Sequence, residues 1–544
     1  MTSTAKPFPF SSAATRLDRI ALAVIGAGGL ATVLVVLAYR AFELDRFFVP
    51  KELALHVTGV IVGVVALVRV QRLAFTRADL LLLVWLGLSF LSVLFAGNQW
   101  LAMRAFAISF SGAAVYWSAR RLAAAELGDK LVLLLAAVVV VGAFTALAQA
   151  YGLKMEFASL SRAPGGTFGN RNFMAHLSGV GLPLLLYGVA VSRSWRSAAA
   201  LTAGLAVCAG ALVLSRTRAA WLALMVWGVV TLVLTTRGPT LIVGKTARRR
   251  LQVAAATTLA GIVLALLIPN ALDWKSENPY LDSVKGVVNY KEGSGQGRLR
   301  QYQHSLAMTA AHPLLGVGPG NWPVAYPRYA PAGDPSLVEE TRMTANPWPS
   351  SDWVAALSER GPLATLAFAG ALVLLFGAAI RTRFNADATS DERLAALAGA
   401  SVIGIAVLEG AFDAVLLLPA PALVVWATVG ALVPAGRVVR QTSLSNKQRM
   451  ALQFLVLAGG LSFGALSTSK IQAMSIYTNG GSTAALDEAA RLDPGSYRIR
   501  MRAADAWLGR GLCAKARPHA LAARDLFPNA PAPKRLLAQC PGRE

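Results

Sequence analysis

The amino-acid sequence predicts an all-α protein that crosses a membrane many times, and three observations lead to this fold class. Hydrophobic residues make up 55% of the 544 residues, and charged residues only 15%. About thirteen apolar runs recur, each of roughly 18 residues or more, which is enough to cross a hydrocarbon core of about 30 Å as a helix. Strand-like segments are scarce. We therefore expect about 12–13 transmembrane helices.

The apolar runs set the expected order of the elements. The first run, Ile20–Leu37, is too long for a signal peptide and has no small-residue cleavage site close behind it, so we interpret it as a membrane anchor. Later examples are Leu131–Tyr151, Phe173–Val191, Leu251–Pro269 and Leu363–Ile380. The predicted division is a cytoplasmic segment 1–19, transmembrane helices 1–9 in 20–269, a large periplasmic loop in 270–352, helices 10–13 in 353–468, and a periplasmic helical tail in 470–544.

The basic residues predict the orientation of the chain in the membrane. The net charge is +24, and cytoplasmic loops carry the excess of lysine and arginine in membrane proteins. With a cytoplasmic N-terminus, every second loop is basic, and these loops include Arg77, Arg120, Arg196, Arg381 and Arg437. Nucleic acid is not an expected partner, because no basic stretch alternates with aromatic residues outside the apolar runs.

The segment 470–544 contains an internal repeat. Leu492-Asp493-Pro494 returns as Leu526-Phe527-Pro528 after 34 residues, and Ala489 matches Ala523 at the same interval. A helical period of this length that ends in a turn proline is typical of tetratricopeptide repeats. We predict a small array of helical hairpins on the outer membrane surface, and an irregular helical tail is the alternative.

The three cysteines fall into two groups. Cys208 lies inside an apolar run, where we expect it to serve packing. Cys513 and Cys540 both lie in the tail, and an oxidising periplasm would favour a disulfide between them. The sequence leaves open whether the helices bring the two side chains together.

Two pairs of arginines are candidate binding residues, because a charge beside a membrane is costly unless it is used. Arg216 and Arg218 lie in a short outer turn, and Arg298 and Arg300 lie in the large outer loop. Arginine offers a planar fork of donors that matches phosphate oxygens and keeps its proton. We predict that the two pairs form a pyrophosphate clamp. For Arg216 and Arg218, contact with anionic lipid headgroups is the alternative.

The glycine-rich segment Gly165–Asn172 precedes an apolar run on the same side. Glycines permit a close approach of the backbone and positive φ angles. Exposed N–H groups at a helix start suit an anion, so Asn170 and Asn172 are candidate pyrophosphate-binding residues. A tight turn followed by a helix N-cap is the alternative.

Ser350, Asp352 and Glu359 are the candidate catalytic residues, at the end of the large loop and one to two turns beyond it. Asp352 is a candidate general base, or a group that orients an incoming hydroxyl. As an alternative, a serine at this point caps the helix that follows. Glu409 and Asp413 are four residues apart, and we expect them to pair with a basic residue across the bundle.

Four segments, in this order, resemble the O-antigen ligase and polymerase family of bacterial inner membranes: GTFGNRNFMAH, SRTRAAWLAL, GRLRQYQHSLAMTAAHPLLGVGPGNW and SSDWVAALSERG. The resemblance covers Gly165–Gly361 and depends on the order, spacing and shared outer location of the segments. It implies a GT-C-type glycosyltransferase that needs neither a metal nor a cofactor. The implied substrates are a glycan on undecaprenyl pyrophosphate and an acceptor, which is lipid A core, a protein or the growing glycan.

The resemblance also implies roles for single residues. Arg218 and Arg298 match the family arginines that hold the pyrophosphate, in agreement with the clamp. The family usually has a histidine where this chain has Ser350. The base is then replaced, with Asp352 as the best candidate, or deprotonation is unnecessary, or transfer activity has been lost.

Three hypotheses follow for the function. The first is a ligase or polymerase of lipid-linked glycans, with a protein partner at the tail. The second is a catalytically inactive membrane scaffold of a polysaccharide assembly system. The third is a secondary transporter or lipid-glycan translocase, which the absence of repeated broken helices in the sequence disfavours.

Overall fold

The computed structural model of the protein describes residues 14–68, 70–154, 158–159, 162–239, 241, 244–274, 276–286 and 293–540. Eleven helices in this part of the chain are long and apolar enough to cross a membrane. They are α1 (Arg16–Leu34), α2 (Asp45–Leu67), α3 (Arg77–Leu94), α5 (Gly128–Ala150), α6 (Arg171–Val191), α7 (Trp195–Ser215), α8 (Arg218–Thr236), α9 (Lys245–Leu267), α13 (Asp352–Phe384), α14 (Ser390–Gly410) and α16 (Asn446–Asn479).

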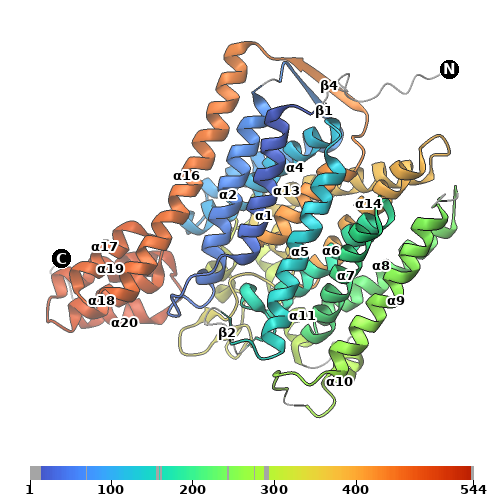
Figure 1. Ribbon diagram of the computed structural model, residues 1–544. Coiled ribbons are helices and arrows are strands. Elements are labelled where there is room, and N and C mark those ends of the chain that lie inside the picture. Colours follow the sequence, from blue (N-terminus) through green and yellow to red (C-terminus); the bar gives the residue numbers. More distant parts are fainter. Residues whose placement is uncertain are drawn as a thin grey trace.

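Two further helices complete the bundle (Figure 1). The longer one is α4 (Gln99–Ala124), and the shorter, apolar one is α15 (Pro419–Leu432). The two pack against each other, and α4 also packs against α2. Together with the eleven long helices they account for the apolar runs of the sequence, so the prediction of an all-α polytopic membrane protein is confirmed.

Four helices begin with the same local interaction. At the starts of α1, α3, α14 and α16, the hydroxyl of the N-cap residue accepts a hydrogen bond from the third helical residue, whose side chain bonds back to the cap. This capping box satisfies two backbone donors that have no partner inside the helix. The cap residues are Thr15, Thr76, Thr389 and Ser445. Alternation of the spans places all four caps at one end of the bundle.

A short antiparallel ribbon lies at that same end of the bundle (Figure 1). It consists of β1 (Arg72–Thr76), which precedes α3, and β4 (Val438–Ser443), which precedes α16. Arg72 pairs with Ser443 and Thr76 pairs with Val438, with an irregularity between Phe75 and Thr76. The ribbon joins two segments that are far apart in the sequence.

The opposite end carries the large loop between α9 and α13. Its elements are α10 (Pro279–Lys285), α11 (Gly293–Ala311), α12 (Trp322–Ala325), η2 (Tyr326–Arg328), β2 (Leu337–Val338) and β3 (Met343–Thr344), and η1 (Gly166–Phe168) lies at the same end. Met308, Trp322 and Tyr326 form a small buried core within the loop. The indole N–H of Trp322 donates to the hydroxyl of Ser305 over 2.9 Å. The loop is therefore a folded part of the molecule.

The tail forms two successive helix pairs, α17 (Thr483–Leu492) with α18 (Tyr497–Leu508), and α19 (Cys513–Leu526) with α20 (Pro531–Gln539). The repeated leucines Leu492 and Leu526 are the last residues of α17 and α19. Ala489 and Ala523, which match at the same interval, are both fully buried. The sequence interval thus corresponds to equivalent positions in the two pairs, while the assignment to tetratricopeptide repeats stays a prediction.

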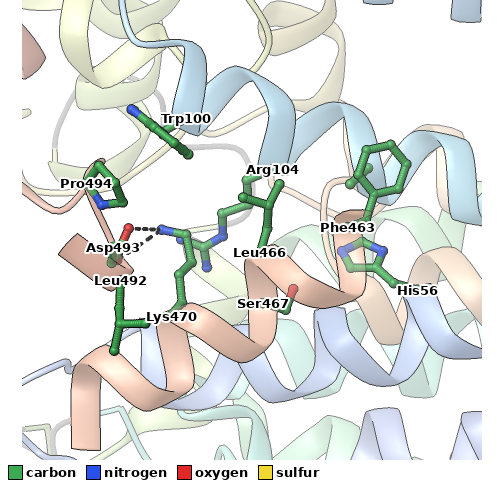
Figure 2. Close-up of a pocket in the computed structure, with 11 residues that line it drawn as sticks. His56, Trp100, Arg104, Phe463, Leu466, Ser467, Lys470, Leu492, Asp493 and Pro494 are labelled. Atoms are coloured by element: carbon green, nitrogen blue, oxygen red, sulfur yellow. Dashed lines mark hydrogen bonds and ion pairs between the residues drawn. The ribbon is translucent and has the colours of Figure 1, made fainter. Parts of the chain in front are cut away.

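The tail is fixed to the membrane bundle. The sequence places the end of the last span near Ser467, whereas α16 continues to Asn479 and carries the tail. Lys470 of α16 forms an ion pair of 3.2 Å with Asp493 at the end of α17 (Figure 2). A Cβ atom at Gly495 would lie 2.4 Å from the side chain of Trp100, so glycine permits this close contact. Helix α16 therefore extends without interruption from the membrane bundle to the tail.

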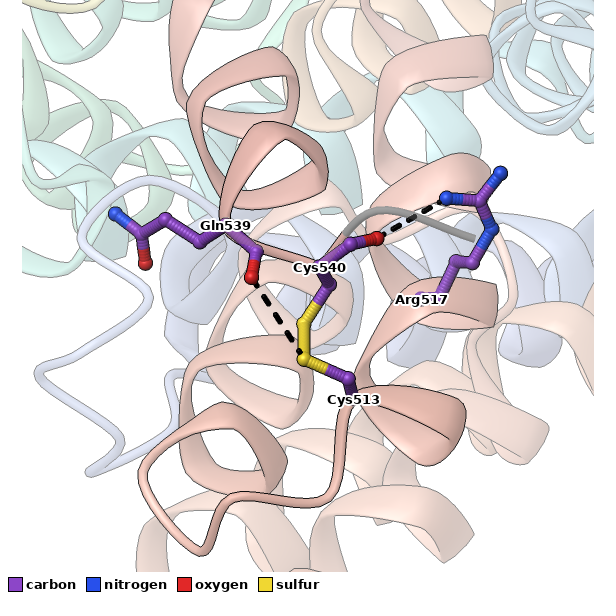
Figure 3. Close-up of a disulfide and its surroundings, with 4 residues drawn as sticks. All are labelled: Cys513, Arg517, Gln539 and Cys540. Carbon is purple, nitrogen blue, oxygen red and sulfur yellow. Dashed lines mark hydrogen bonds between the residues drawn. A yellow bond between two sulfur atoms is a disulfide. The ribbon is translucent and has the colours of Figure 1, made fainter. Parts of the chain in front are cut away.

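A disulfide between Cys513 and Cys540 links the start of α19 to the end of α20 (Figure 3). Arg517 donates a hydrogen bond of 3.1 Å to the carbonyl oxygen of Cys540. Cys208 is a free thiol and is buried, as expected. A structural disulfide persists in oxidising compartments, which agrees with the predicted location of the tail outside the cytoplasm.

We predict that Cys513 and Cys540 are oxidised in the native membrane. After denaturation without reductant, a maleimide–polyethylene glycol reagent should add only to Cys208, and after reduction it should add to all three cysteines. Gel shifts measure both states. A Cys208→Ser variant provides the control, with no label before reduction. Labelling of all three cysteines without reductant would contradict the prediction.

Candidate functional site

The turn between α14 and α15, Gly410–Leu416, is the point at which the candidate residues meet. Side chains from three helices contact its backbone or its one carboxylate. Tyr302 of α11 donates to the carbonyl oxygen of Ala411 over 2.9 Å. Ser351, at the start of α13, donates to the carbonyl oxygen of Gly410 over 3.0 Å. These bonds satisfy backbone oxygens of a turn next to the membrane, where an unpaired polar group is costly.

Asp352 is bound to this turn through both carboxylate oxygens. Oδ1 accepts from the N–H of Val415 over 3.1 Å, and Oδ2 accepts from the N–H of Leu416 over 2.8 Å. The backbone N–H of Asp352 donates to the carbonyl oxygen of Asp413 over 3.2 Å. The residue is only 7% exposed. Asp352 therefore holds the start of α13 against the turn.

Asp413 is the carboxylate of the turn that faces the other helices. Its Oδ2 accepts a hydrogen bond of 2.9 Å from the amide of Asn172 and lies 3.4 Å from Nε2 of His176. Asn172 and His176 are four residues apart on α6, so they share one face of that helix. The other ring nitrogen of His176, Nδ1, lies 3.7 Å from Oε2 of Glu409. Both His176 and Glu409 are fully buried.

Charge balance keeps Asp413 ionised. Burial alone would raise the pKa of this carboxyl, but His176 and the positive charge of Arg298 outweigh burial and hold the pKa below its usual value. The expected pairing of Glu409 and Asp413 with a basic residue is confirmed, and that residue is His176. His176 was not among the site residues predicted from the sequence. Its place four residues after Asn172 in GTFGNRNFMAH nevertheless indicates that both side chains face one partner.

Arg298 is positioned by the helix on which it lies. Tyr302, one turn further along α11, donates to the carbonyl oxygens of Ser350 and Ala411 over 2.7 and 2.9 Å. Residues four apart lie on one face of a helix, so Arg298 is directed to the same turn. Arg300 is exposed, and it lies two residues away on another face. Arg298, unlike Arg300, therefore lies on the face of α11 that meets the turn, and its positive charge helps to lower the pKa of Asp413.

The short turn after α7 reaches the same point through Thr217. The hydroxyl of Thr217 donates to the side-chain oxygen of Asn172 over 3.2 Å, and Asn172 in turn donates to Asp413. Arg218, the next residue, donates from Nη1 to the carbonyl oxygen of Gly286 over 2.8 Å. A chain of hydrogen bonds therefore links the turn of Arg218 to the carboxylate on which Arg298 acts.

Arg216 and Asn170 have local contacts of their own. Arg216 ends α7 with φ +56°, donates to the hydroxyl of Ser283 over 2.9 Å and lies over the ring of Trp274 at 4.5 Å. Asn170 is the N-cap of α6, and its side chain accepts from the N–H of Asn172 over 3.0 Å. The capping alternative therefore describes Asn170.

The glycines before Asn170 are explained by close packing. Gly169 has φ +70°, and a Cβ atom there would lie 2.4 Å from the ring of Phe47. Gly165 approaches the backbone of Asn170 so closely that a Cβ atom would lie 2.6 Å from its nitrogen. These contacts set the start of α6, and with it Asn172 and His176.

Glu359 lies apart from this cluster. Its Oε2 accepts from the N–H of Gly320 over 2.8 Å, and its Oε1 accepts from the N–H of Trp322 over 3.1 Å. The residue is 1% exposed. Glu359 thus binds the glycine-rich turn of the large loop to α13. Ser350 is half-buried, and its backbone N–H donates to the side chain of Gln301 over 3.1 Å.

The comparison with known proteins supports the resemblance in this region. Residues 203–369 match the family model described as O-antigen ligase. The matched stretch runs from α7 to α13, so it includes the turn of Arg218, all of α11, and Ser350 and Asp352. Asn172, His176 and Asp413 lie outside it. No curated protein matches the chain.

We predict that replacing Glu359 by alanine destabilises the large loop without altering a substrate contact. The variant leaves two backbone N–H groups buried without an acceptor, at a cost of about 1–3 kcal/mol each. Thermal unfolding of the detergent-purified protein measures the loss. Arg300→Ala, at an exposed position on α11, is the control and should leave stability within about 0.5 kcal/mol. Equal stabilities of the two variants would contradict the role assigned to Glu359.

Proposed function

We propose that the protein transfers or polymerises a glycan carried on undecaprenyl pyrophosphate at the outer face of the bacterial inner membrane. Its N-terminus would then be cytoplasmic and its tail periplasmic. The match of residues 203–369 to the O-antigen ligase family supports the lipid-linked glycan as substrate class. The observation that carries the proposal is a chain of two hydrogen bonds, from Thr217 to Asn172 and from Asn172 to Asp413. Thr217 directly precedes Arg218, and the charge of Arg298 helps to lower the pKa of Asp413, so this chain connects the surroundings of the two arginines.

The two arginines would bind the departing pyrophosphate. Transfer of the glycan breaks the bond between its first sugar and the pyrophosphate oxygen, so negative charge develops on that oxygen. Donors that are already in position stabilise such a charge more than mobile donors do. Asp413 contributes to this preorganisation, because it orients α6 and balances the charge of Arg298 when no donor is bound.

Asp413 is better suited than Asp352 to act on the acceptor hydroxyl. Its lowered pKa keeps it as the anion, which accepts a hydrogen bond from a hydroxyl and so orients it. His176, which lies 3.4 Å from Asp413, would supply a second ionisable group in a chain that has Ser350 in place of the family histidine. Asp352 would then position the turn, through the two backbone bonds that occupy its carboxylate.

A non-catalytic scaffold is the second candidate, and the serine at position 350 favours it. A scaffold would keep the arginines and bind the lipid-linked donor without transferring the glycan. The two functions differ in one measurement, which is turnover by the wild-type protein under conditions in which donor binding is observed.

We predict that Arg218→Ala and Arg298→Ala each reduce glycan transfer by about 10²–10³-fold, the usual cost of removing one preorganised donor. The measurement is a transfer assay with the reconstituted full chain and a polyprenyl-pyrophosphate glycan. Arg300→Ala is the matched control on the same helix and should retain activity. Wild-type transfer rates in both arginine variants would rule out the clamp.

We predict that Asp413→Asn lowers turnover by about 10²-fold or more while donor binding persists. Asp352→Asn should instead lower thermal stability together with activity, because the amide replaces one of the two acceptor oxygens. Unfolding temperature, donor binding and turnover are measured on both variants. If Asp352→Asn loses turnover at unchanged stability while Asp413→Asn is active, Asp352 and not Asp413 acts on the acceptor hydroxyl.

A further inference from the structure

A cavity of about 950 Å³ lies at the end of the bundle remote from the candidate site. It is lined by the start of α3, by one face of α13, and by the segment that leads from α15 into β4. Helix α13 begins at Asp352, in the candidate site, and reaches this cavity through residues near its other end. The two sites therefore lie on opposite sides of the membrane bundle.

The cavity changes in character along α13. Leu374, Leu375 and Ala378 line it toward the middle of α13, and Arg381, Thr382 and Asn385 line it toward the end of that helix. At a rise of about 1.5 Å per residue, this face passes from apolar to polar over about 16 Å. Such a gradient fits an amphiphile whose chain lies toward the membrane interior and whose headgroup lies at the surface.

Three arginines line the polar part of the cavity, one from each wall. Arg77 is the first residue of α3, Arg381 lies in the last turn of α13, and Arg437 directly precedes β4. No acidic residue belongs to the described lining. The nearest carboxylate in sequence to Arg77, that of Asp79, is bound by Trp117 and Arg120. The charge in the cavity is therefore unbalanced.

Three arginines at this end of the bundle that are buried or half-buried are bound within the protein. Arg121 pairs with Asp18, Arg383 donates to the carbonyl oxygen of Pro239, and Arg393 donates to that of Ala388. Within the described residues, Arg77, Arg381 and Arg437 have no hydrogen-bond, ion-pair or ring partner. Three exposed arginines without a partner among the described residues therefore line one cavity.

We propose that this cavity binds a membrane lipid with an anionic, phosphate-bearing headgroup. The guanidinium groups match phosphate oxygens in geometry and charge, and basic pockets at the cytoplasmic ends of transmembrane helices bind such headgroups. The apolar wall of α13 accommodates the start of an acyl chain, which a free phosphate ion does not use. The bound lipid would join α3, α13 and the segment before β4 into one unit.

The test uses the full chain purified in a neutral detergent, with thermal unfolding and native mass spectrometry as readouts. Phosphatidylglycerol should raise the unfolding temperature and remain bound, whereas phosphatidylcholine and inorganic phosphate should have little effect. The triple variant Arg77→Gln, Arg381→Gln, Arg437→Gln should bind phosphatidylglycerol at least about tenfold more weakly, which corresponds to about 1.4 kcal/mol.

A charge-matched variant separates a specific site from general attraction to a basic protein. Arg72→Gln, Arg440→Gln, Lys447→Gln removes three positive charges from the same end of the bundle without changing the cavity lining, and it should bind the lipid like the wild type. Arg437→Gln alone, outside any helix or strand, should show part of the loss if the triple variant does not fold. Equal lipid binding by the cavity variants and the charge-matched variant, or equal stabilisation by inorganic phosphate, would overturn the proposal.

Discussion

The turn between α14 and α15 constrains the rest of the bundle end that carries the large loop. Its peptide groups lie beside the membrane, where water is not available to all of them, and an unpaired group there costs several kcal/mol. Ser351, Asp352 and Tyr302 supply the missing partners. Because these side chains come from different segments, satisfying one turn also fixes the start of α13 and the axis of α11.

The same physical reason explains how charges are distributed in the bundle. A buried charge in a low dielectric is tolerated when it is paired and hydrogen-bonded. Arg104 lies between Asp45 and Glu52, and Arg120 is bound to Asp79. Arg77, Arg381 and Arg437 line the cavity beside β4 with exposed side chains, where the headgroup of the proposed lipid would supply the opposite charge.

Hydropathy was sufficient to predict the spans, because a transmembrane helix must satisfy its own backbone and therefore needs only length and apolar character. The 34-residue interval also placed Leu492 and Leu526 at equivalent helix ends. The roles of single polar residues were harder to predict. Asp352 and Glu359 differ little in sequence context, yet one binds the α14–α15 turn and the other binds Gly320 and Trp322. Local sequence does not show which distant backbone N–H groups a carboxylate meets.

The partners of His176 could likewise not be predicted from local sequence. This residue also suggests how an ionisable group from another helix can replace one that is missing from a motif. It is fully buried between the carboxylates of Glu409, at the end of α14, and Asp413, in the turn that follows, both of which come more than two hundred residues later in the chain. A sequence comparison confined to residues 203–369 covers Ser350 but not this residue. Since a proton can be accepted by any suitably placed carboxylate–imidazole pair, the position of an ionisable group in space matters more than its place in the motif. In this chain Asp413 connects His176 and Arg298, because it lies 3.4 Å from the ring of His176 and the charge of Arg298 helps to lower its pKa.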